Sequence, residues 1–470
     1  MKKRTFSEAR PWQALLRTRK FWQSLQILMA VFTLAGCGEN AKLPASAGIG
    51  THPTLPPPET SVIPTVHIAE AKGWPKDVTP IAAKGMTVTE FAGNLDHPRW
   101  IYVLPNGDVL VAETNAPAQP KDNQGLRGWV MGKVMKKAGA AVPSADRITL
   151  LRDTNNDGVA EYSSVLLDQL HSPFGMSLVG DFLYVANTDA VLRFPYAEGD
   201  TVINDPGEVL LKLPAGPINH HWTKNIIASL DKQKLYVTVG SNSNIGENGM
   251  EAEEGRAAIW QVDLSNGQHH IFASGLRNPN GMAWEPVNET LWTVVNERDE
   301  LGGDLVPDYL TSVKQDGFYG WPYSYYGNHL DERVKPQNPQ LVENAIVPDY
   351  AVGSHTAPLG LAFSNNNQLA PSFAEGMFIG QHGSWNRKPF NGYKVIFVPF
   401  QNGQPVGEPF DVLTGFIDED NNAYGRPVGV AIDGHGALLV ADDVGNKIWR
   451  VSAEHSQAEL SLQSAQRWHF

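Results

Sequence analysis

The feature that most constrains the fold is a short β-rich pattern that recurs six times between Met86 and Val451. Each unit holds an apolar run of strand-forming residues directly after a turn, as in Val109–Ala112, which follows the turn Pro105–Asp108. Runs of this kind bounded by turn residues are typical of hairpins. The six runs begin at Val109, Phe182, Leu235, Leu291, Met377 and Leu438.

A second apolar strand, introduced by Pro or Gly, lies before most of these hairpins, as in Pro358–Ala362. Repeated units of about four strands close radially and hide their sheet edges without helices. The chain has 44 glycines and 33 prolines, which favours many short turns. A parallel α/β fold would need helical periods between the strands, and the sequence contains none. We therefore predict an all-β, six-bladed β-propeller with four-stranded antiparallel blades.

The first residues predict export. Seven basic residues precede a short apolar run, Leu25–Gly36, which is too short to cross a bilayer comfortably and is typical of a signal peptide. The run ends in Leu34-Ala35-Gly36-Cys37, which resembles the lipobox of bacterial lipoproteins, with Cys37 as the lipidated residue. The alternative is an ordinary signal peptide with an incidental cysteine. Gly38, and not Asp, follows Cys37, and by resemblance to lipoprotein sorting this favours the periplasmic side of the outer membrane over retention at the inner membrane.

These patterns divide the chain into four parts. We predict a signal peptide over 1–36, a lipid-anchored tether and lead-in over 37–84, the propeller over 85–452 and a polar tail over 453–470. Six prolines between residues 38 and 64 favour an extended spacer that would hold the propeller off a membrane.

Charge and cysteine content exclude several functions. The net charge of −13 repels phosphate backbones, so no nucleic-acid partner is expected. A single cysteine permits neither an internal disulfide nor a CxxCH haem attachment. Any electron that the protein releases would therefore need a separate carrier.

Polar residues recur just before the Pro/Gly strands. In a propeller these segments meet at one mouth of the central channel, so we expect a functional site there. The residues at these positions are His171, His220, His221, Arg277, Asn278, His355, Thr356 and Arg426.

Several motifs resemble the soluble quinoprotein sugar dehydrogenases, in particular the branch similar to L-sorbosone dehydrogenase. The resemblance rests on Leu276–Met282 (LRNPNGM), Tyr319–Pro322 (YGWP), Gly240–Asn244 (GSNSN) and Leu104–Glu113. It covers most of residues 85–452. It implies oxidation of an aldose or a related sugar aldehyde or alcohol by hydride transfer to pyrroloquinoline quinone (PQQ).

The resemblance also implies residue roles. His221 looks like the general base, and a neutral imidazole suits that task at periplasmic pH. The family usually has an acidic residue before the base, where this chain has His220, so the residues leave open which histidine acts. Arg277 and Asn278 match contacts near the quinone oxygens, and guanidinium groups suit the cofactor's three carboxylates. The further cofactor candidates are His171, His355, Thr356, Arg387 and Arg426, with Arg387 equally interpretable as a surface residue.

The resemblance implies a Ca²⁺ ion that polarises the quinone. Arg298 and Asp299 fall at the positions whose carbonyls bind this ion, although the family's Gly-Pro pair is absent. Asp304 and Tyr319 align with a second, structural calcium. A separate stretch, Asp153–Gly158, matches the start of an EF-hand loop, but position twelve is Ser164, which favours a hairpin turn.

Three functions fit these observations. The first is a PQQ- and Ca²⁺-dependent sugar dehydrogenase with a separate electron acceptor, a cytochrome or a quinone-linked protein. The second is a calcium-dependent propeller hydrolase of the lactonase kind. The third is a non-catalytic binding propeller. The cations at Arg277 and Arg426 favour the first, because a lactone needs no cradle for several anionic groups.

Overall fold

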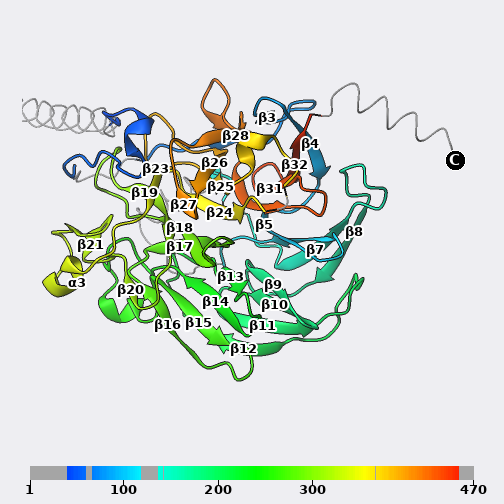
Figure 1. Ribbon diagram of the computed structural model, residues 1–470, viewed down its shortest axis with the longest axis horizontal. Helices are drawn as coiled ribbons and strands as arrows, with labels where there is room; N and C mark the ends of the chain where they lie inside the picture. The colour runs from blue at the N-terminus through cyan, green and yellow to red at the C-terminus, as the bar shows by residue number, and fades with distance from the viewer. Residues whose placement is uncertain are drawn as a thin grey trace, which may run out of the picture.

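The computed structural model describes residues 40–59, 66–117, 136–140, 142–216, 218–365 and 367–454. They form a ring of six antiparallel blades, as predicted, and the chain passes from blade to blade around the ring (Figure 1). Blade 1 contains β5 (Pro98–Val103), β6 (Val109–Glu113), β7 (Arg147–Arg152) and β8 (Tyr162–Leu167). Blade 2 contains β9 (Met176–Val179), β10 (Phe182–Ala186), β11 (Ala190–Pro195) and β12 (Glu208–Lys212).

The next two blades each carry one extra strand. Blade 3 contains β13 (Ile226–Ala228), β14 (Lys234–Val239), β15 (Ala258–Asp263) and β16 (His269–Ser274), with β20 (Gly317–Phe318) added in parallel. Blade 4 contains β17 (Asn278–Glu285), β18 (Thr290–Asn296), β19 (Pro307–Ser312) and β23 (Tyr350–Ser354), with β1 (Ile49–Gly50) at its outer edge.

The last two blades complete the ring. Blade 5 contains β24 (Pro358–Phe363), β25 (Gly376–Gln381), β26 (Lys394–Gln401) and β28 (Phe410–Thr414), with β3 (Ile81–Ala82) beyond it and β27 (Gln404–Pro405) paired to β26. Blade 6 contains β30 (Pro427–Ile432), β31 (Leu438–Asp442), β32 (Lys447–Ala453) and β4 (Met86–Ala92). Because β4 comes from the start of the propeller and pairs with the last strand, it closes the ring through main-chain hydrogen bonds.

The short elements lie outside the blades. They are η1 (Ala45–Gly48), η2 (Met250–Glu253), α3 (Pro339–Glu343), η3 (Pro371–Phe373) and the two small pairs β2 (Glu70–Ala71) with β29 (Asn422–Ala423) and β21 (Ser324–Tyr325) with β22 (His329–Leu330). Among the described residues, none of the helices is long and apolar enough to cross a membrane.

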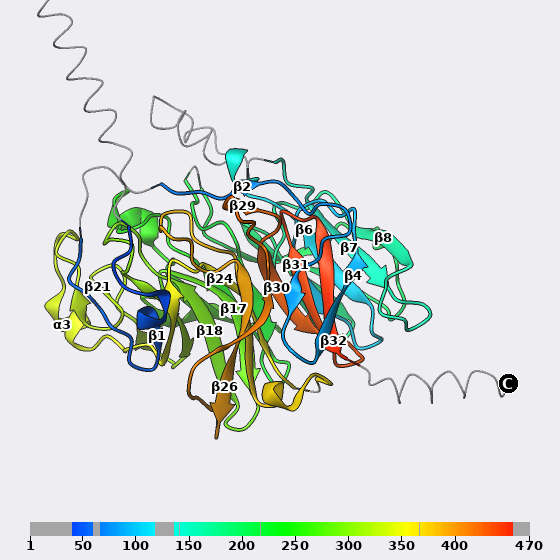
Figure 2. The same ribbon diagram turned by 90° about the horizontal axis from the view of Figure 1, so that it is seen from above.

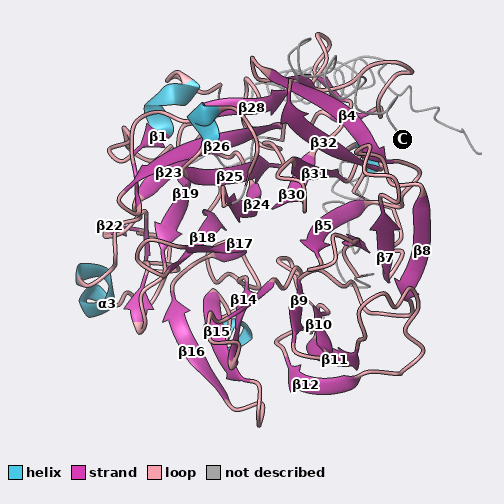
Figure 3. Ribbon diagram, turned by 45° about the vertical axis from the view of Figure 1, so that its right-hand side comes forward, coloured by secondary structure: helices cyan, strands magenta, loops and turns pink. Residues whose placement is uncertain are grey.

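The Pro/Gly strands are the innermost strands and surround the channel (Figure 3). Their glycines permit close packing of neighbouring blades. A Cβ added to Gly360 would lie 2.1 Å from the carbonyl oxygen of Val428 in the next blade. A Cβ added to Gly429 would lie 2.8 Å from the carbonyl oxygen of Arg99. The glycines of this motif are therefore required by the contact between inner strands.

Buried apolar side chains fill the spaces between blades. Leu110 of blade 1, Leu183 of blade 2 and Phe174, which precedes blade 2, belong to one such cluster. Each fully buried side chain of this size contributes about 1.5–3 kcal/mol of hydrophobic stabilisation. In β6 every side chain is buried: Leu110 and Ala112 belong to this cluster, and Val109 and Val111 belong to a second one. The apolar runs seen in the sequence thus fill the interfaces on both faces of a blade.

The segment expected to be an extended spacer is instead docked on the propeller over its described part. β1 pairs with β23, and the main-chain nitrogen of Glu59 donates to the carbonyl of Leu301 at 2.9 Å. Farther along, β2 lies beside β29 at one face of the molecule (Figure 2). Main-chain pairing with sheet edges outweighs the tendency of the prolines to keep this segment extended. The predicted signal peptide, Cys37 and most of the polar tail lie outside the described residues.

Candidate functional site

The segments that precede the inner strands converge at one end of the channel, which we call the mouth. Side chains link one blade to the next there: Asn225 Nδ2 donates to the carbonyl of Asn280 at 3.2 Å, and Asn296 Nδ2 donates to that of Pro358 at 2.9 Å. His221, Arg277 and His355 lie in these segments. The structure therefore brings three of the predicted site residues to one place.

The position and tautomer of His221 are determined by Ser241. The Nδ1 atom of His221 lies 2.8 Å from the main-chain oxygen of Ser241 and 3.0 Å from its hydroxyl. Because a carbonyl oxygen only accepts, Nδ1 carries the proton and Nε2 keeps its lone pair. Burial and the positive charge of Arg277 hold the pKa of His221 well below its ordinary value. The ring is therefore neutral and has one nitrogen able to accept a proton.

The neighbouring histidine has a different environment. His220 is exposed, whereas His221 is packed beside Gly240. Below the loop, the buried Lys224 donates to the carbonyls of His221 and Trp222 at 3.3 Å each. Burial lowers the pKa of Lys224 to about 7. This lysine, which the sequence reasoning missed, supports the loop of His221, so the geometry favours His221 over His220 as the base.

Arg277 is held by main-chain and side-chain acceptors. Its Nη1 donates to the carbonyl of Glu297 at 2.6 Å, and its Nη2 donates to Asn244 Oδ1 at 3.0 Å and to Asp299 Oδ2 at 3.1 Å. Its Nε is buried without a hydrogen-bond partner among the described residues. The carbonyl of Arg277 also accepts from the nitrogen of Ser241 at 2.7 Å, which connects it to His221. Arg277 is thus fixed in place and retains one free donor.

The side chain of Asp299 is the centre of the network. Besides Arg277, it accepts from Asn386 Nδ2 at 2.8 Å and lies 3.4 Å from His355 Nδ1. Burial alone would raise the pKa of Asp299, but the positive charge of Arg277 and the hydrogen bond to His355 lower it. Burial alone would lower the pKa of His355, but Asp299 raises it above its ordinary value. With the carbonyl of Gly302 3.0 Å from its Nε2, His355 has an acceptor at each ring nitrogen.

Two further carboxyl groups lie beneath this network. Burial raises the pKa of Glu297 to about 7 and that of Asp308 to about 6. Asp308 accepts from the nitrogens of Glu297 and Ala357 at 2.8 Å each, and from the hydroxyl of Thr356 at 3.3 Å. Thr356, expected to flank the quinone ring, is therefore engaged in joining blades 4 and 5.

Of the other predicted cofactor residues, Asn278 and Arg426 are buried, whereas His171 is exposed. Asn278 lies beside His221, since a Cβ on Gly240 would meet both Asn278 Oδ1 and His221 Cβ. That Oδ1 has no hydrogen-bond partner in the described structure. Arg426 is buried, with its guanidinium 5.1 Å from the ring centre of Tyr393. His171, in contrast, is exposed and pairs with Asp189 at 3.0 Å.

Arg387 has a structural role in place of the predicted contact with a cofactor carboxylate. Its guanidinium donates to the carbonyls of Gly303 and Pro389 at 2.9 Å each, and it lies 3.3 Å from Asp304. It also reaches the carbonyl of Leu43 at 3.4 Å. Arg387 therefore holds the docked N-terminal segment.

Several groups at the predicted calcium positions have protein partners. The carbonyl of Asp299 accepts from Arg298 Nη2 at 2.7 Å and from Asn244 Nδ2 at 3.2 Å, and the Arg298 guanidinium forms a buried ion pair with Asp331. Both carboxylate oxygens of Asp304 are engaged, by Arg387 and by the nitrogens of Lys42 and Leu43. The Tyr319 hydroxyl donates to the carbonyl of Ser312 at 2.5 Å. The Asp299 carbonyl, the Asp304 carboxylate and the Tyr319 hydroxyl would have to exchange these partners before an ion could bind through them.

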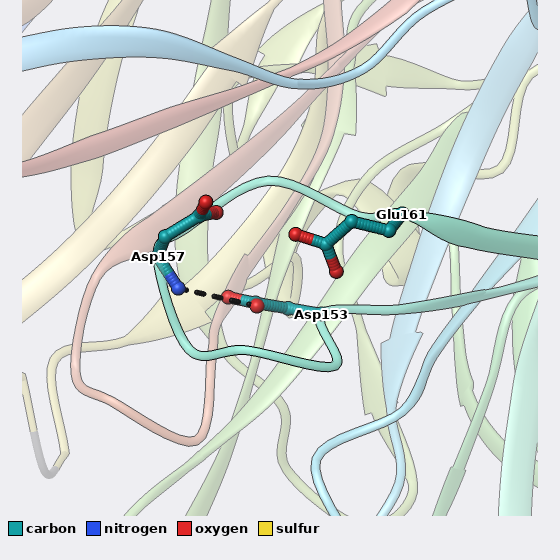
Figure 4. A group of neighbouring side chains, drawn as sticks. All are labelled: Asp153, Asp157 and Glu161. Carbon is teal, nitrogen blue, oxygen red and sulfur yellow. Dashed lines mark hydrogen bonds between the residues drawn. The ribbon is translucent and has the colours of Figure 1, made fainter.

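The stretch that starts like an EF-hand is a hairpin turn between β7 and β8, as the sequence favoured. Within the described residues, Asp153, Asp157 and Glu161 are the one group of at least three metal-competent side chains (Figure 4). Main-chain nitrogens satisfy part of the group, since Gly158 donates to Asp153 at 2.8 Å and Thr154 donates to Glu161 at 2.8 Å. The group belongs to the outer part of blade 1, away from the residues of the mouth.

Asn244 and Asn386 are site residues that the sequence reasoning did not assign. Asn244 bonds both Arg277 and Asp299, and Asn386 bonds Asp299. Each follows a strand whose end lies at the mouth: β14 for Asn244 and β25 for Asn386. Their positions directly after these strands could have identified Asn244 and Asn386 from the sequence.

A family match covers the propeller. Residues 143–316 and 330–454 match the family described as TrAA12-like. This is more than half of the chain. It includes the four main strands of blades 2 to 5, three of the four strands of blade 6 and all of the mouth residues described above.

Two relatives of this chain are named as sugar dehydrogenases. An aldose sugar dehydrogenase of Escherichia coli is 27% identical over 41% of this chain and 46% of its own length. A pyrroloquinoline quinone-dependent pyranose dehydrogenase of Coprinopsis cinerea is 24% identical over 78% of this chain and 54% of its own length. The chain therefore spans about half the length of these two relatives.

Solved structures share the fold. A calcium structure of a Trichoderma reesei carbohydrate-active enzyme of family AA12 superposes with a TM-score of 0.65 and 19% identity. The superposition covers 83% of this chain and 99% of that one. It supports the propeller architecture independently of the sequence pattern.

Proposed function

Since the chain belongs to the TrAA12-like family of PQQ-dependent sugar dehydrogenases, we propose that it oxidises an aldose or a related sugar aldehyde or alcohol with PQQ as cofactor. The observation that carries the proposal is the neutral His221, which lies in one hydrogen-bond network with Arg277. A sugar oxidation needs a base for the hydroxyl proton and a cation near the developing negative charge. The mouth has both.

The residues of the mouth suit an anionic quinone. Arg277 and Arg426 are both buried, and the Nε atom of each has no hydrogen-bond partner among the described residues. A buried donor of this kind is costly unless a ligand satisfies it. Arg277 would face the quinone oxygens and Arg426 a carboxylate, with Asn278 beside the base. The resemblance supplies these assignments, and the free donors support them.

The chain's own part in the reaction is proton transfer and charge stabilisation. When bound, PQQ supplies an electrophilic carbonyl that accepts the two electrons of the substrate carbon–hydrogen bond as hydride. His221 accepts the hydroxyl proton at Nε2, and the hydroxyl-bearing carbon becomes a carbonyl. Ser241 holds the imidazole in the required tautomer. Arg277 stabilises the negative charge, because Asn244, Asp299 and the carbonyl of Glu297 fix its guanidinium.

We include calcium in the proposal as a bound ion, but we assign it no step of the reaction. The resemblance and the calcium structure of the fungal neighbour support it. In this chain, however, the carbonyl of Asp299 and the carboxylate of Asp304 have protein partners. We therefore assign calcium no donor atom and route no chemistry through it.

The lactonase alternative has less support. A hydrolase of that kind needs a metal held by side chains near the channel, and the three-carboxylate group among the described residues lies at the β7–β8 turn. The free guanidinium donors of the mouth would have no use in lactone hydrolysis. These donors also favour the dehydrogenase function over that of a non-catalytic binding propeller.

Location and electron acceptor extend the proposal. Lipidation at Cys37 would place the protein at the periplasmic side of the outer membrane, where a cytochrome or quinone-linked protein would collect the two electrons. The sugar class, including sorbosone- or glucose-like substrates, rests on the resemblance.

A dye-reduction assay tests the proposed function. Purified protein should reduce an artificial acceptor with aldoses only after PQQ is added, and the assay is run after EDTA treatment with and without added Ca²⁺. Protein that binds no PQQ under either condition, or that hydrolyses lactones without it, contradicts the proposal.

A further inference from the structure

A second polar cluster lies at the mouth, among residues of blades 1, 5 and 6. Its centre is Asp443, directly after β31, whose Oδ2 accepts from Arg99 Nη1 at 2.7 Å and lies 2.9 Å from His382 Nε2. His97 Nε2 lies 3.5 Å from the same oxygen. We call these four residues the Asp443 cluster. One carboxylate therefore accepts from Arg99 and His382, and the unpartnered Nε2 of His97 lies close to it.

The Asp443 cluster is continuous with the site of the base. The guanidinium of Arg99 lies 5.6 Å from the ring centre of Trp222, the residue after His221. On its other side, the nitrogen of Asp443 donates to the carbonyl of Arg426 at 3.4 Å. The cluster thus spans the mouth between His221 and Arg426.

The cluster contains buried groups without partners. The Nε atoms of Arg99 and Arg426 and the Oδ1 atom of Asp443 are buried and have no hydrogen-bond partner among the described residues. The neighbouring carboxylate of Asp442 does not serve the guanidinium groups, because it accepts from the indoles of Trp74 and Trp449 and from the nitrogen of Arg426. Arg99 pairs with Asp443, whereas the Arg426 guanidinium has no carboxylate partner among the described residues and donates to the carbonyl of Ala69 at 3.4 Å. This leaves positive charge and free donors for an anion.

His382 responds to this excess charge. Burial, Arg426 and Arg99 lower the pKa of His382 below its ordinary value, although Asp443 opposes them. Burial lowers the pKa of His97 further, to about 4. Near neutral pH both rings are neutral, and His382 donates its Nε2 proton to Asp443. The remaining titratable neighbour, Tyr393, has a pKa that burial raises, so it stays protonated.

We propose that Arg99, Arg426 and His382 form a carboxylate-binding site in which Asp443 positions Arg99 and His382, and that binding of a carboxylate there is accompanied by uptake of a proton by His382. The guanidinium donors match a carboxylate in geometry and charge. Once an anion occupies the site, it offsets the two guanidinium charges that keep His382 neutral, so the imidazolium becomes favourable. The proposal deepens the proposed function, since a carboxylate of PQQ is the ligand expected there. A carboxylated sugar has the same chemistry.

Calorimetry distinguishes these cases. PQQ is titrated into the full protein at pH 7 in bis-Tris and in Tris, whose protonation enthalpies differ, so that the heat difference gives the protons taken up. A second titration uses glucuronate or gluconate in place of PQQ. Wild-type protein should take up a substantial fraction of a proton with one of these ligands. Uptake with PQQ identifies a cofactor carboxylate, and uptake with the sugar acid alone identifies the substrate side.

Two matched variants test the assignment. His382→Gln can still donate a hydrogen bond to Asp443 but does not titrate, so proton uptake should disappear while affinity falls by about tenfold or less. His97→Gln is the control from the same cluster and should keep the uptake, because His97 does not titrate in this range. Arg99→Ala should weaken ligand binding by about 10- to 100-fold, and Arg99→Lys should restore part of that loss.

The outcomes separate the two proposals. If neither ligand binds to wild-type protein, both proposals fail. If PQQ binds without proton uptake, or if uptake persists in His382→Gln, the inference is wrong while the proposed function stands. Thermal unfolding of each variant confirms that the altered protein is folded before its titration is interpreted.

Discussion

The main-chain oxygen of Ser241 accepts the Nδ1 proton of His221 at 2.8 Å, and the main-chain nitrogen of the same serine donates to the carbonyl of Arg277 at 2.7 Å. One residue thus sets the tautomer of the proposed base and connects it to Arg277, the residue proposed to stabilise negative charge. Both bonds use the main chain, so they depend on the path of the loop after β14 and not on the serine side chain.

The first prediction concerns the base. Replacing a positioned general base costs about 10² to 10⁴ in rate. His221→Gln should therefore lose most of kcat while it retains PQQ, and the exposed His220→Gln should lose much less. Steady-state kinetics with PQQ titrations provide the measurement. The reverse ranking would assign the base to His220, and full activity in both variants would contradict catalysis by this loop.

The second prediction concerns pH. Because burial and Arg277 hold the pKa of His221 well below 6.5, activity should be flat near neutral pH and fall only in more acidic solution, as Nε2 becomes protonated. Arg277→Gln removes the positive charge, so the acidic limb of its kcat profile should move to higher pH. Arg277→Lys keeps the charge and should leave the limb close to its original position. An unshifted limb in Arg277→Gln would show that this arginine does not act on the base.

The third prediction concerns stability. The pKa of His355 is raised by Asp299, so this pair stabilises the folded state fully below about pH 6.5, the ordinary value for histidine, and less as pH rises through the folded-state pKa. His355→Gln should lower the free energy of unfolding by about 1.5–3 kcal/mol at pH 5.5. The loss should be smaller at pH 8.5. Urea unfolding at the two pH values measures it, and an equal loss at both would mean that His355 is not charged in the folded protein.

The fourth prediction concerns the N-terminus. If Cys37 is lipidated, Cys37→Ala should release the protein from membranes into the soluble fraction. Metabolic labelling with a fatty-acid analogue should mark the wild-type protein and not this variant. The propeller is unaffected by this change, so the soluble variant should keep its PQQ-dependent activity. Continued membrane retention of Cys37→Ala would remove the lipid anchor from the proposal.

The sequence alone determined the blade count and indicated which segments meet at the mouth. Turn residues and alternating apolar residues are local signals, and the Pro/Gly strands mark where inner strands pack, as Gly360 and Gly429 illustrate. Residues that precede such strands must reach the same mouth in any closed ring. His221 and Arg277 could therefore be placed without coordinates.

Only the tertiary structure decided which side chains meet. Arg99 and Asp443 are 344 residues apart and pair because β4 closes the ring beside blade 1. Arg387 faces the docked N-terminal segment and not the mouth, because Asp304 and the carbonyl of Gly303 lie within its reach. The sequence shows which residues are cations. Which partner each cation binds depends on burial and distance, which ring closure creates and which no local sequence pattern predicts.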